Sequence, residues 1–360
     1  MNIKSLLLGS AAALAVVSGA QAADAVVAAE PEQMEYVKVC DAYGTGFFYI
    51  PGTETCLKIG ATLRYEKRIK KTGDADSVYD NHGRIRFDVE SRNDSEWGTV
   101  YSWIRLQGDQ VNNGNDAAGS DPAAALKWYY YFGIGGAEFG NWDSQWKKFL
   151  GTGFTDDGGI YQSDDDFPDS RQYVSYTAEF GSTKVYVSLD NDADEYYDTS
   201  DVGGKIYRGE SHSDKDLNDL NRGRKYMPDV TAGVSTEFND WLVGANVAYD
   251  ESAESVAVKG VVAGEFGMFG VRALGFWSDS YQNIFFNYDG FSAILGLQAT
   301  VTDSVILSKD IQFWDNGDWR IVGDAEWKVA SGFSVLFEGI YADRYDVKTK
   351  QGMLRFQRKF

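Results

Sequence analysis

The sequence predicts an all-β fold: a transmembrane antiparallel β-barrel of about 16 strands, with short turns at one end and long loops at the other. Three observations predict it. Apolar and polar residues alternate along most of the 360 residues, as they do in strands with two different faces. After the N-terminal segment, no apolar run approaches the ~20 residues that a membrane helix needs. Aromatic residues make up 15% of the chain, and 39 Gly against 5 Pro fits many strands joined by tight turns.

The first 22 residues have the pattern of a secretory signal peptide. Lys4 supplies the positive charge, residues 6–17 supply the apolar core, and Ala20-Gln21-Ala22 supplies the small residues of a cleavage site. A retained membrane anchor is the alternative, which the shortness of the segment disfavours. We expect an exported chain in which residues 23–360 form a single barrel domain, because no Pro- or Ser-rich linker divides them.

Alternation defines the expected strands. In an early one, Leu57, Ile59 and Leu63 share one face, and polar residues occupy most of the other. Counting such segments gives an even number of strands, as a single-chain membrane barrel requires. Their predicted starts lie near residues 57, 83, 98, 125, 137, 171, 183, 229, 241, 254, 267, 291, 303, 318, 332 and 347. The register stays open over residues 98–135 and 279–316.

Two of these strands carry aromatic residues at both ends of their apolar face. In the first strand, Trp241 and Tyr249 lie at the two ends of the apolar face. In the second, Trp319 and Trp327 do so. Small or aliphatic residues lie between the aromatic residues in both. Eight residues at ~3.3 Å per residue and a tilt near 40° span roughly 20 Å along the barrel axis. That spacing approximates the two aromatic girdles of a membrane barrel, whereas a soluble β-sandwich has no reason for it.

The connections are of two kinds. Short ones are expected to be periplasmic turns, and longer acidic ones are expected to be outer loops. The predicted short turns are Gly135-Gly136, Gly181-Ser182, Asn239-Asp240 and Ser331-Gly332. Residues 143–170 interleave aromatic residues with acids, so we expect this loop to pack against a wall. Residues 191–228 have fewer aromatic anchors and are expected to form an exposed surface loop.

The C-terminal strand is apolar on one face. Leu354, Phe356 and Phe360 alternate with Arg355, Gln357 and Lys359. This pattern predicts a closing strand that pairs with the first and removes both sheet edges, although a sandwich strand is an alternative for this stretch alone. With the signal peptide, Phe356 and Phe360 predict a C-terminal outer-membrane assembly signal. Arg358 lies on the apolar face, so its side chain is expected to extend to the membrane interface.

Cys40 and Cys56 are the only cysteines. An even pair in an exported protein predicts a disulfide that closes a small loop, contributing about 2–4 kcal/mol. Metal ligation is the alternative, but no second Cys or His pair accompanies them. We expect no metal site and no cofactor.

Both ends of the chain resemble a known family. The resemblance is carried by the stretches Ala61-Thr-Leu-Arg-Tyr65, Leu354-Arg-Phe-Gln-Arg-Lys-Phe360 and Tyr36-Val-Lys-Val-Cys40-Asp-Ala-Tyr-Gly-Thr-Gly-Phe-Phe-Tyr-Ile-Pro51-Gly-Thr-Glu-Thr-Cys56-Leu-Lys58. They resemble the alphaproteobacterial porins, the general porins of Brucella, Bartonella and the rhizobia. The resemblance implies a homotrimeric, sixteen-stranded, multi-pass protein of the outer membrane. It also implies that the third outer loop, here residues 143–170, folds into the lumen as a constriction.

Basic residues are expected on the pore side of the first strands. Alternation puts Lys58, Arg64, Arg84 and Arg86 on the face away from lipid. A bare cation that faced lipid at the middle of the membrane would cost ~2–4 kcal/mol. The resemblance implies pore-facing arginines at Arg64, Arg86 and Arg105, and at Arg105 it brings Tyr101 and Trp103 inward too.

Acids of the expected constriction loop would oppose these cations and create a transverse field that filters solutes by charge and size. They are Asp156, Asp157, Asp164, Asp165, Asp166 and Asp169. In the alternative, these acids face solvent and the arginines pair with Glu66, Asp88 and Glu90.

Charge bounds the function. A net charge of −20 opposes nucleic-acid binding, and in a channel it favours mild cation selectivity. From the predicted barrel and the family resemblance, we expect a channel for passive diffusion of ions and small hydrophilic solutes. Expected partners are outer-membrane lipid and lipopolysaccharide. A sugar-specific channel with Trp103, Tyr129 and Tyr131 as stacking groups is one alternative, and a structural or adhesin barrel is another. We expect no enzyme, because only His82 and His212 are present and no nucleophile-elbow, phosphate-loop or zinc-protease motif occurs.

Overall fold

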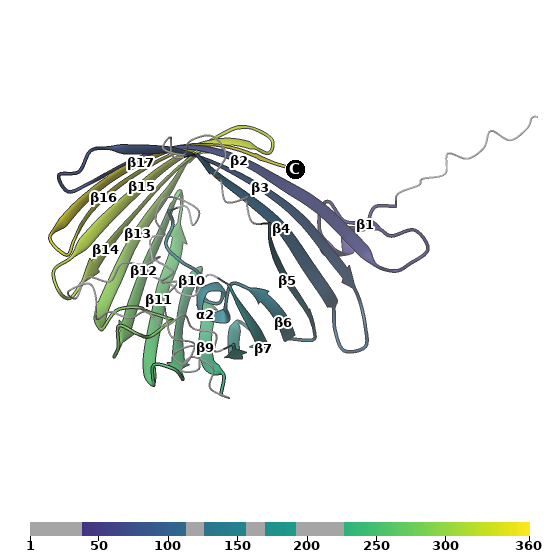
Figure 1. Cartoon of the computed structure of the whole chain (residues 1–360). Coiled ribbons are helices and arrows are strands. Elements are labelled where there is room, and N and C mark those ends of the chain that lie inside the picture. The colour runs from purple at the N-terminus through teal and green to yellow at the C-terminus, as the bar shows by residue number, and fades with distance from the viewer. Residues whose placement is uncertain (1–37, 113–125, 156–169, 192–226) are drawn as a thin grey trace, which may run out of the picture. The chain divides into compact units, whose positions relative to one another are not determined.

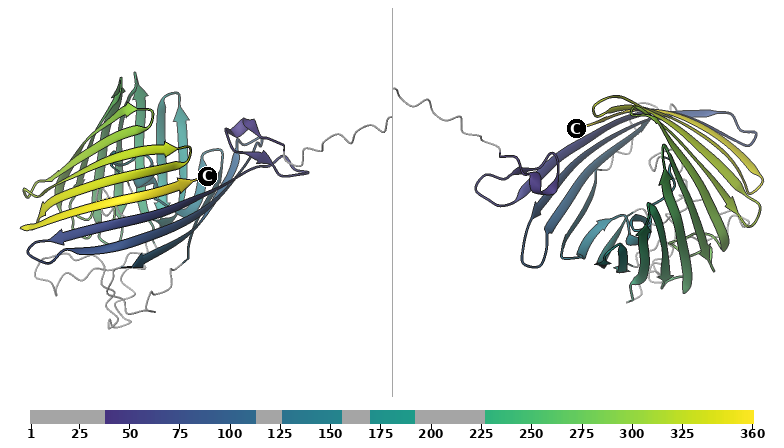
Figure 2. Two further views of the ribbon diagram at one scale, coloured as in Figure 1. Left: turned by 90° about the horizontal axis from the view of Figure 1, so that it is seen from above. Right: turned by 180° about the vertical axis from the view of Figure 1, so that it is seen from behind.

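Sixteen strands, β2 to β17, form one closed antiparallel ring in the described part of the chain (Figures 1 and 2). The structure is a computed structural model that describes residues 38–112, 126–155, 170–191 and 227–360. Each strand pairs with the next, and β17 pairs back onto β2 from Thr349↔Thr72 to Lys359↔Thr62. The predicted closed barrel is therefore confirmed. Among the described residues, no helix is both long enough and apolar enough to cross a membrane.

The strand bounds agree closely with the alternation. The strands are β2 Cys56–Thr72, β3 Val78–Asn93, β4 Val100–Asn112, β5 Lys127–Ile134, β6 Ala137–Trp142, β7 Arg171–Phe180, β8 Thr183–Asp190, β9 Asp229–Phe238, β10 Trp241–Asp250, β11 Ser255–Phe266, β12 Phe269–Ser278, β13 Gly290–Thr302, β14 Val305–Trp314, β15 Trp319–Ala330, β16 Phe333–Arg344 and β17 Val347–Lys359. The largest difference is at β3, predicted near 83. The strand begins earlier because the polar residues Asp80, Asn81 and His82 pair with Arg68, Lys67 and Glu66 of β2.

The two faces of the ring differ as the sequence predicts. On β10, Trp241, Val243, Val247 and Tyr249 are 42–47% exposed on the outer face, whereas Ala248 on the inner face is fully buried. On β15, Trp327 is exposed on the outside and Val322 is buried on the inside. A barrel of this kind turns its exposed apolar belt towards lipid.

The four predicted tight turns join β5 to β6, β7 to β8, β9 to β10 and β15 to β16. In the β9–β10 turn, Asn239 and Asp240 have φ values of 45° and 64°, which is the geometry of a two-residue hairpin. Because strands alternate in direction, these turns lie at one end of the barrel and the long connections at the other.

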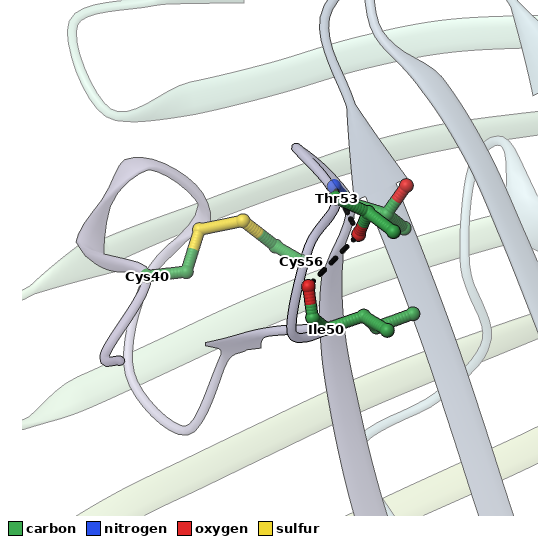
Figure 3. The surroundings of a disulfide bond; sticks show 5 residues. Cys40, Ile50, Thr53 and Cys56 are labelled. Carbon is green, nitrogen blue, oxygen red and sulfur yellow. Dashed lines mark hydrogen bonds between the residues drawn. A yellow bond between two sulfur atoms is a disulfide. The ribbon is translucent and has the colours of Figure 1, made fainter. Parts of the chain in front are cut away.

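A short arm precedes β2 at the turn end. It contains the 3₁₀-helix η1 (Asp41–Tyr43) and the strand β1 (Phe48–Tyr49), which pairs with Cys56 and Leu57. The predicted Cys40–Cys56 disulfide is present, and both cysteines are 1% exposed (Figure 3). The Thr53 hydroxyl donates to the carbonyl of Ile50 at 3.0 Å within the same loop (Figure 3). The bond therefore ties the arm to the start of the first barrel strand.

The C-terminus closes the ring. The amide of Phe360 donates to the carbonyl of Ala61 at 3.1 Å, and the amide of Ala61 donates back at 2.8 Å. Phe356 is 40% exposed on the outer face and Arg355 is 2% exposed on the inner one, so the predicted faces of this strand are confirmed. Arg358 Nη1 donates to the carbonyl of Ser331 at 2.5 Å, in the β15–β16 turn.

Candidate channel lining

The inner face of β2–β4 is densely charged, and we call it the charged wall. Cross-strand pairing brings its residues into register, with Arg64 opposite Arg84, Thr62 opposite Arg86, and Asp88 opposite Arg105. Its cations are Lys58, Arg64, Arg68, Lys70, Arg84, Arg86, Arg92 and Arg105, and its acids are Glu66, Asp80, Asp88, Glu90 and Asp109. The five basic positions singled out from the sequence therefore share one face, which carries three positive charges in excess.

Glu66 is the hub of this wall. It is fully buried, and its Oε1 accepts from Arg355 Nε of β17 at 2.6 Å and lies 3.7 Å from Arg64 Nη1. Its Oε2 accepts from Arg68 and lies 3.1 Å from His82 Nδ1. One carboxylate thus compensates several cations in a site with little solvent, where losing a partner leaves a buried charge.

Four further cations also have partners on the wall. Arg84 pairs with Asp109, Arg105 Nε donates to Asp88 at 2.7 Å, and Arg92 pairs with Glu90. Arg86 Nε donates to the side-chain oxygen of Gln107 at 2.7 Å. These pairs include those with Glu66, Asp88 and Glu90 that the sequence offered as the alternative to opposing acids on the constriction loop. The six aspartates expected in the constriction lie outside the described residues, as do residues 1–22 and most of 191–228.

Next to the charged wall lies a cluster of inward aromatic rings. Trp103 stacks on Tyr131 at 5.0 Å between centroids, and Arg105 lies over Trp103 at 4.7 Å. Trp142 contacts Trp103 and Tyr129 at 4.9 Å each. Trp103 is only 9% exposed because its neighbours cover it, which leaves little of its surface for a solute.

The connection between β6 and β7 enters the ring. We call residues 143–170 the inserted segment; Asp143–Thr155 and Ser170 are described. Its helix α2 (Gln145–Lys148) lies inside the ring (Figure 1). Glu138 anchors this helix, because its Oε1 accepts from Gln145 Nε2 at 3.2 Å and from Lys148 Nζ at 2.6 Å. For residues 143–155, the predicted packing against a wall is confirmed.

From α2 the segment follows the inner face of the barrel as far as β14. Asn246 Nδ2 of β10 donates to the carbonyl of Trp146 at 3.0 Å, and Arg272 of β12 donates to the carbonyl of Thr152. The amide and hydroxyl of Thr155 both donate to Asp310 Oδ2 of β14 at 2.7 Å. We call the inner face of β8–β14 under this segment the filled half.

The filled half contains an apolar core among buried polar side chains, and it has glycines where the segment passes. Trp146 and Leu150 are buried in a core whose barrel members are Ala248, Ala257, Val261, Ala263, Leu274, Phe276, Ile294 and Trp314. A Cβ on Gly244 would lie 2.5 Å from Leu150, and one on Gly296 would lie 2.9 Å from Phe154. These contacts were not predicted from the sequence, although an inward glycine in a strand is a signal that another backbone or ring approaches.

The described residues contain no group of three or more His, Cys, Asp or Glu side chains placed to hold a metal ion. The lining is instead a set of ion pairs on one side and a packed core on the other. Such an arrangement can order water and ions along the charged side.

Comparison with known proteins places the chain in a family. Residues 24–356 match the family model described as "Porin subfamily". The chain is 32% identical to porin Omp2b of Brucella canis, of Brucella suis and of Brucella abortus, with 100% of each protein covered. Among solved structures it resembles OmpF of Salmonella typhi, with a TM-score of 0.60, 8% identity, and 85% of this chain and 98% of that chain covered.

An engineered porin of Rh. blastica also resembles it, with a TM-score of 0.55, 12% identity, and 84% and 100% of the two chains covered. At identities this low, the structural similarity shows a common fold only. The family is shown by the family model and by the full-length relatives at 32% identity. The chain belongs to the porin subfamily and is a multi-pass outer-membrane channel of the alphaproteobacterial general porin type.

Proposed function

We propose that the channel lets ions and small hydrophilic solutes diffuse passively along the charged wall. One observation carries the proposal: the inner face of β2–β4 is lined with ionisable side chains, while the inserted segment packs into an apolar core on the opposite side. Charged rings and walls hold water and ions in a pore, whereas an apolar core excludes them.

We further propose that the channel is mildly cation-selective. The whole chain carries a net charge of −20, although the charged wall has an excess of positive charge. The remaining acids therefore lie elsewhere, many of them in the long connections, where they attract cations to the entrance. The two fields oppose each other, so the preference is weak rather than strong.

The assembly is proposed to be a homotrimer that contacts lipid and lipopolysaccharide. The support is the family membership and the exposed apolar outer face of the barrel. Sedimentation of the purified protein in a mild detergent tests the stoichiometry, and a monomeric mass would contradict it.

A sugar-specific channel finds less support. Its stacking groups were Trp103, Tyr129 and Tyr131, but these rings pack on one another, on Trp142 and under Arg105. Sugar binding in a channel needs exposed ring faces, and Trp103 has little exposed surface. We therefore expect high sugar concentrations to leave the ion current unblocked.

The test is the reversal potential of reconstituted protein in an asymmetric KCl gradient. Replacing Arg64, Arg86 and Arg105 together by Gln is expected to shift the reversal potential further towards cation selectivity. The matched control replaces three exposed lysines of the outer face, Lys67, Lys71 and Lys309, by Gln, and should leave selectivity unchanged. Equal shifts in both variants would refute the assignment of the charged wall to the pore, and an absence of any single-channel current in the wild type would refute the channel itself.

A further inference from the structure

A second connection, between β12 and β13, also lies inside the barrel. We call residues 279–289 the β12–β13 connection. Asn283, Phe285 and Phe286 are fully buried, and Tyr288 is 2% exposed. Phe286 stacks on Phe276 of the inner face of β12, with 5.4 Å between ring centroids. Aromatic side chains of a loop in open solvent would be exposed, so this connection has a packing role.

Polar contacts fix its backbone. Asn283 Nδ2 donates to Ser255 Oγ of β11 at 2.7 Å, and Asn283 Oδ1 accepts from the amides of Phe285 and Phe286 at 3.0 and 3.2 Å. Asp250 Oδ2 of β10 accepts from the amide of Ile284 at 2.8 Å. These bonds fix the backbone around the two phenylalanines, since the amide of Ile284 is satisfied from the barrel wall and those of Phe285 and Phe286 by Asn283.

The far end of the connection is fixed as well. The Tyr288 hydroxyl donates to Asp315 Oδ1 at 2.5 Å, and this hydrogen bond lowers the pKa of the Asp315 carboxyl. The carboxylate also accepts from the amide of Phe291 through Oδ2 at 2.9 Å. Asp315 therefore stays ionised at neutral pH and anchors the connection to the β14–β15 turn.

Phe285 contacts the start of the inserted segment and the first residue of strand β7, which follows the segment. Its ring centroid lies 5.8 Å from that of Trp146, in helix α2. The guanidinium of Arg171, the residue that follows the segment, lies over the same ring at 5.3 Å. Arg171 is itself fixed, because its Nη1 lies 2.7 Å from Asp229 Oδ2 and its Nη2 donates to the carbonyl of Asn191 at 2.6 Å.

We propose that the β12–β13 connection is a clamp that holds the start of the inserted segment, residues 143–155, in place, with Phe285 as its positioning residue. The proposal rests on the proposed channel function, because it makes the clamp a determinant of the open cross-section. One ring packs between helix α2 and the fixed side chain of Arg171, so removing it loosens the start of the segment. The channel then widens, and its open current fluctuates more because the segment changes position during conduction.

The experiment compares single-channel currents of the wild type with those of the double variant Phe285→Ala, Phe286→Ala. We expect the conductance to rise by about 1.5-fold or more, since pore width governs conduction, together with greater open-channel noise. Uptake of neutral solutes of increasing size into protein-containing vesicles should reach larger solutes in the variant.

The matched control removes an aromatic pair from the outer face, Phe266→Ala, Phe269→Ala, whose rings lie 5.9 Å apart and are 54% and 39% exposed. A second variant, Phe285→Leu, keeps the apolar contact but loses the ring, and should show a smaller change in the same direction. If the double variant fails to fold, the conductance of the Phe285→Leu channel tests the clamp proposal instead.

The outcomes separate the two proposals. A wild type without current refutes the channel function. A conducting wild type whose clamp variants match the control in conductance, noise and solute size limit overturns the clamp alone.

Discussion

The charged wall and the filled half are built from the same kind of alternating strand, yet only the filled half has an apolar core on its inner face. On β2–β4 the inward positions carry ion pairs such as Arg105–Asp88, whereas on β10–β14 they combine buried polar residues with an apolar core that includes Ala248, Val261 and Ile294. Alternation decides which side chains face inward, because the period of a strand is two. The chemistry of those inward positions decides whether that side of the lumen stays hydrated or takes up an inserted loop.

The two regions also differ in how they are stabilised. The charged wall depends on ion pairs, and its buried carboxylate, Glu66, contacts Arg64, Arg68 and Arg355. The filled half depends on close packing, with Leu150 lying where Gly244 has no side chain. Single substitutions should therefore act by uncompensated charge in one region and by steric overlap in the other.

The largest expected effect is that of Glu66→Ala. Removing the buried carboxylate leaves several cations without compensation, so the free energy of unfolding should fall by about 3–5 kcal/mol. Denaturant unfolding of the protein in lipid vesicles measures this change. The control Glu90→Ala removes a carboxylate whose pair with Arg92 is partly exposed, and should cost only about 0–1 kcal/mol. Equal losses in the two variants would show that Glu66 is not the hub of the wall.

Gly244→Leu should have the next largest effect, in the filled half. The added side chain overlaps Leu150, and overpacking of this kind costs about 1–3 kcal/mol. Relief of the overlap displaces the inserted segment, so single-channel conductance should rise as well. In the control Gly339→Leu the new side chain meets open space on the outer face, and both quantities should stay unchanged. A Gly244→Leu channel with wild-type conductance would contradict the close contact.

The smallest expected effect is that of Thr155→Val. It removes the hydroxyl that donates to Asp310 but keeps the shape of the side chain and the backbone hydrogen bond, so stability should fall by about 0.5–1.5 kcal/mol. Thr53→Val removes an exposed hydroxyl that donates to a carbonyl, and should change stability by less than about 0.5 kcal/mol. The same unfolding assay resolves the two variants, and a larger loss for Thr53 would contradict the anchoring of the segment.

Much of the barrel was predictable because alternation is a local signal. It located the outer faces of β10 and β15, and the apolar C-terminal strand correctly indicated closure onto β2. It failed at the start of β3, where polar residues on both faces hide the period. Alternation alone did not decide which face Arg105 occupies, because Trp103 shares its face and a tryptophan is equally typical of the lipid-facing side. The family resemblance placed Arg105 on the pore side.

The filled half was harder to predict, because it depends on contacts between distant segments. The sequence indicated that residues 143–170 would meet a wall, but not which one. Phe285 and Phe286 resemble strand residues, and only the folded chain brings Phe285 to Trp146 and Arg171. The one usable local signal was the row of inward glycines at Gly244, Gly270 and Gly296, which lie under Leu150 and Phe154.

Cysteine accessibility during conduction tests the central claim most directly. Both native cysteines form the Cys40–Cys56 disulfide, so an introduced cysteine is the single free thiol of the chain. Arg86→Cys places this thiol on the charged wall, and Val261→Cys places it on the inner face of the filled half, where Val261 is 3% exposed. A bulky charged methanethiosulfonate reagent, added while single-channel current is recorded, should reduce the current of the Arg86→Cys channel and leave that of Val261→Cys unchanged. A current reduced at Val261→Cys and unaffected at Arg86→Cys would contradict the account.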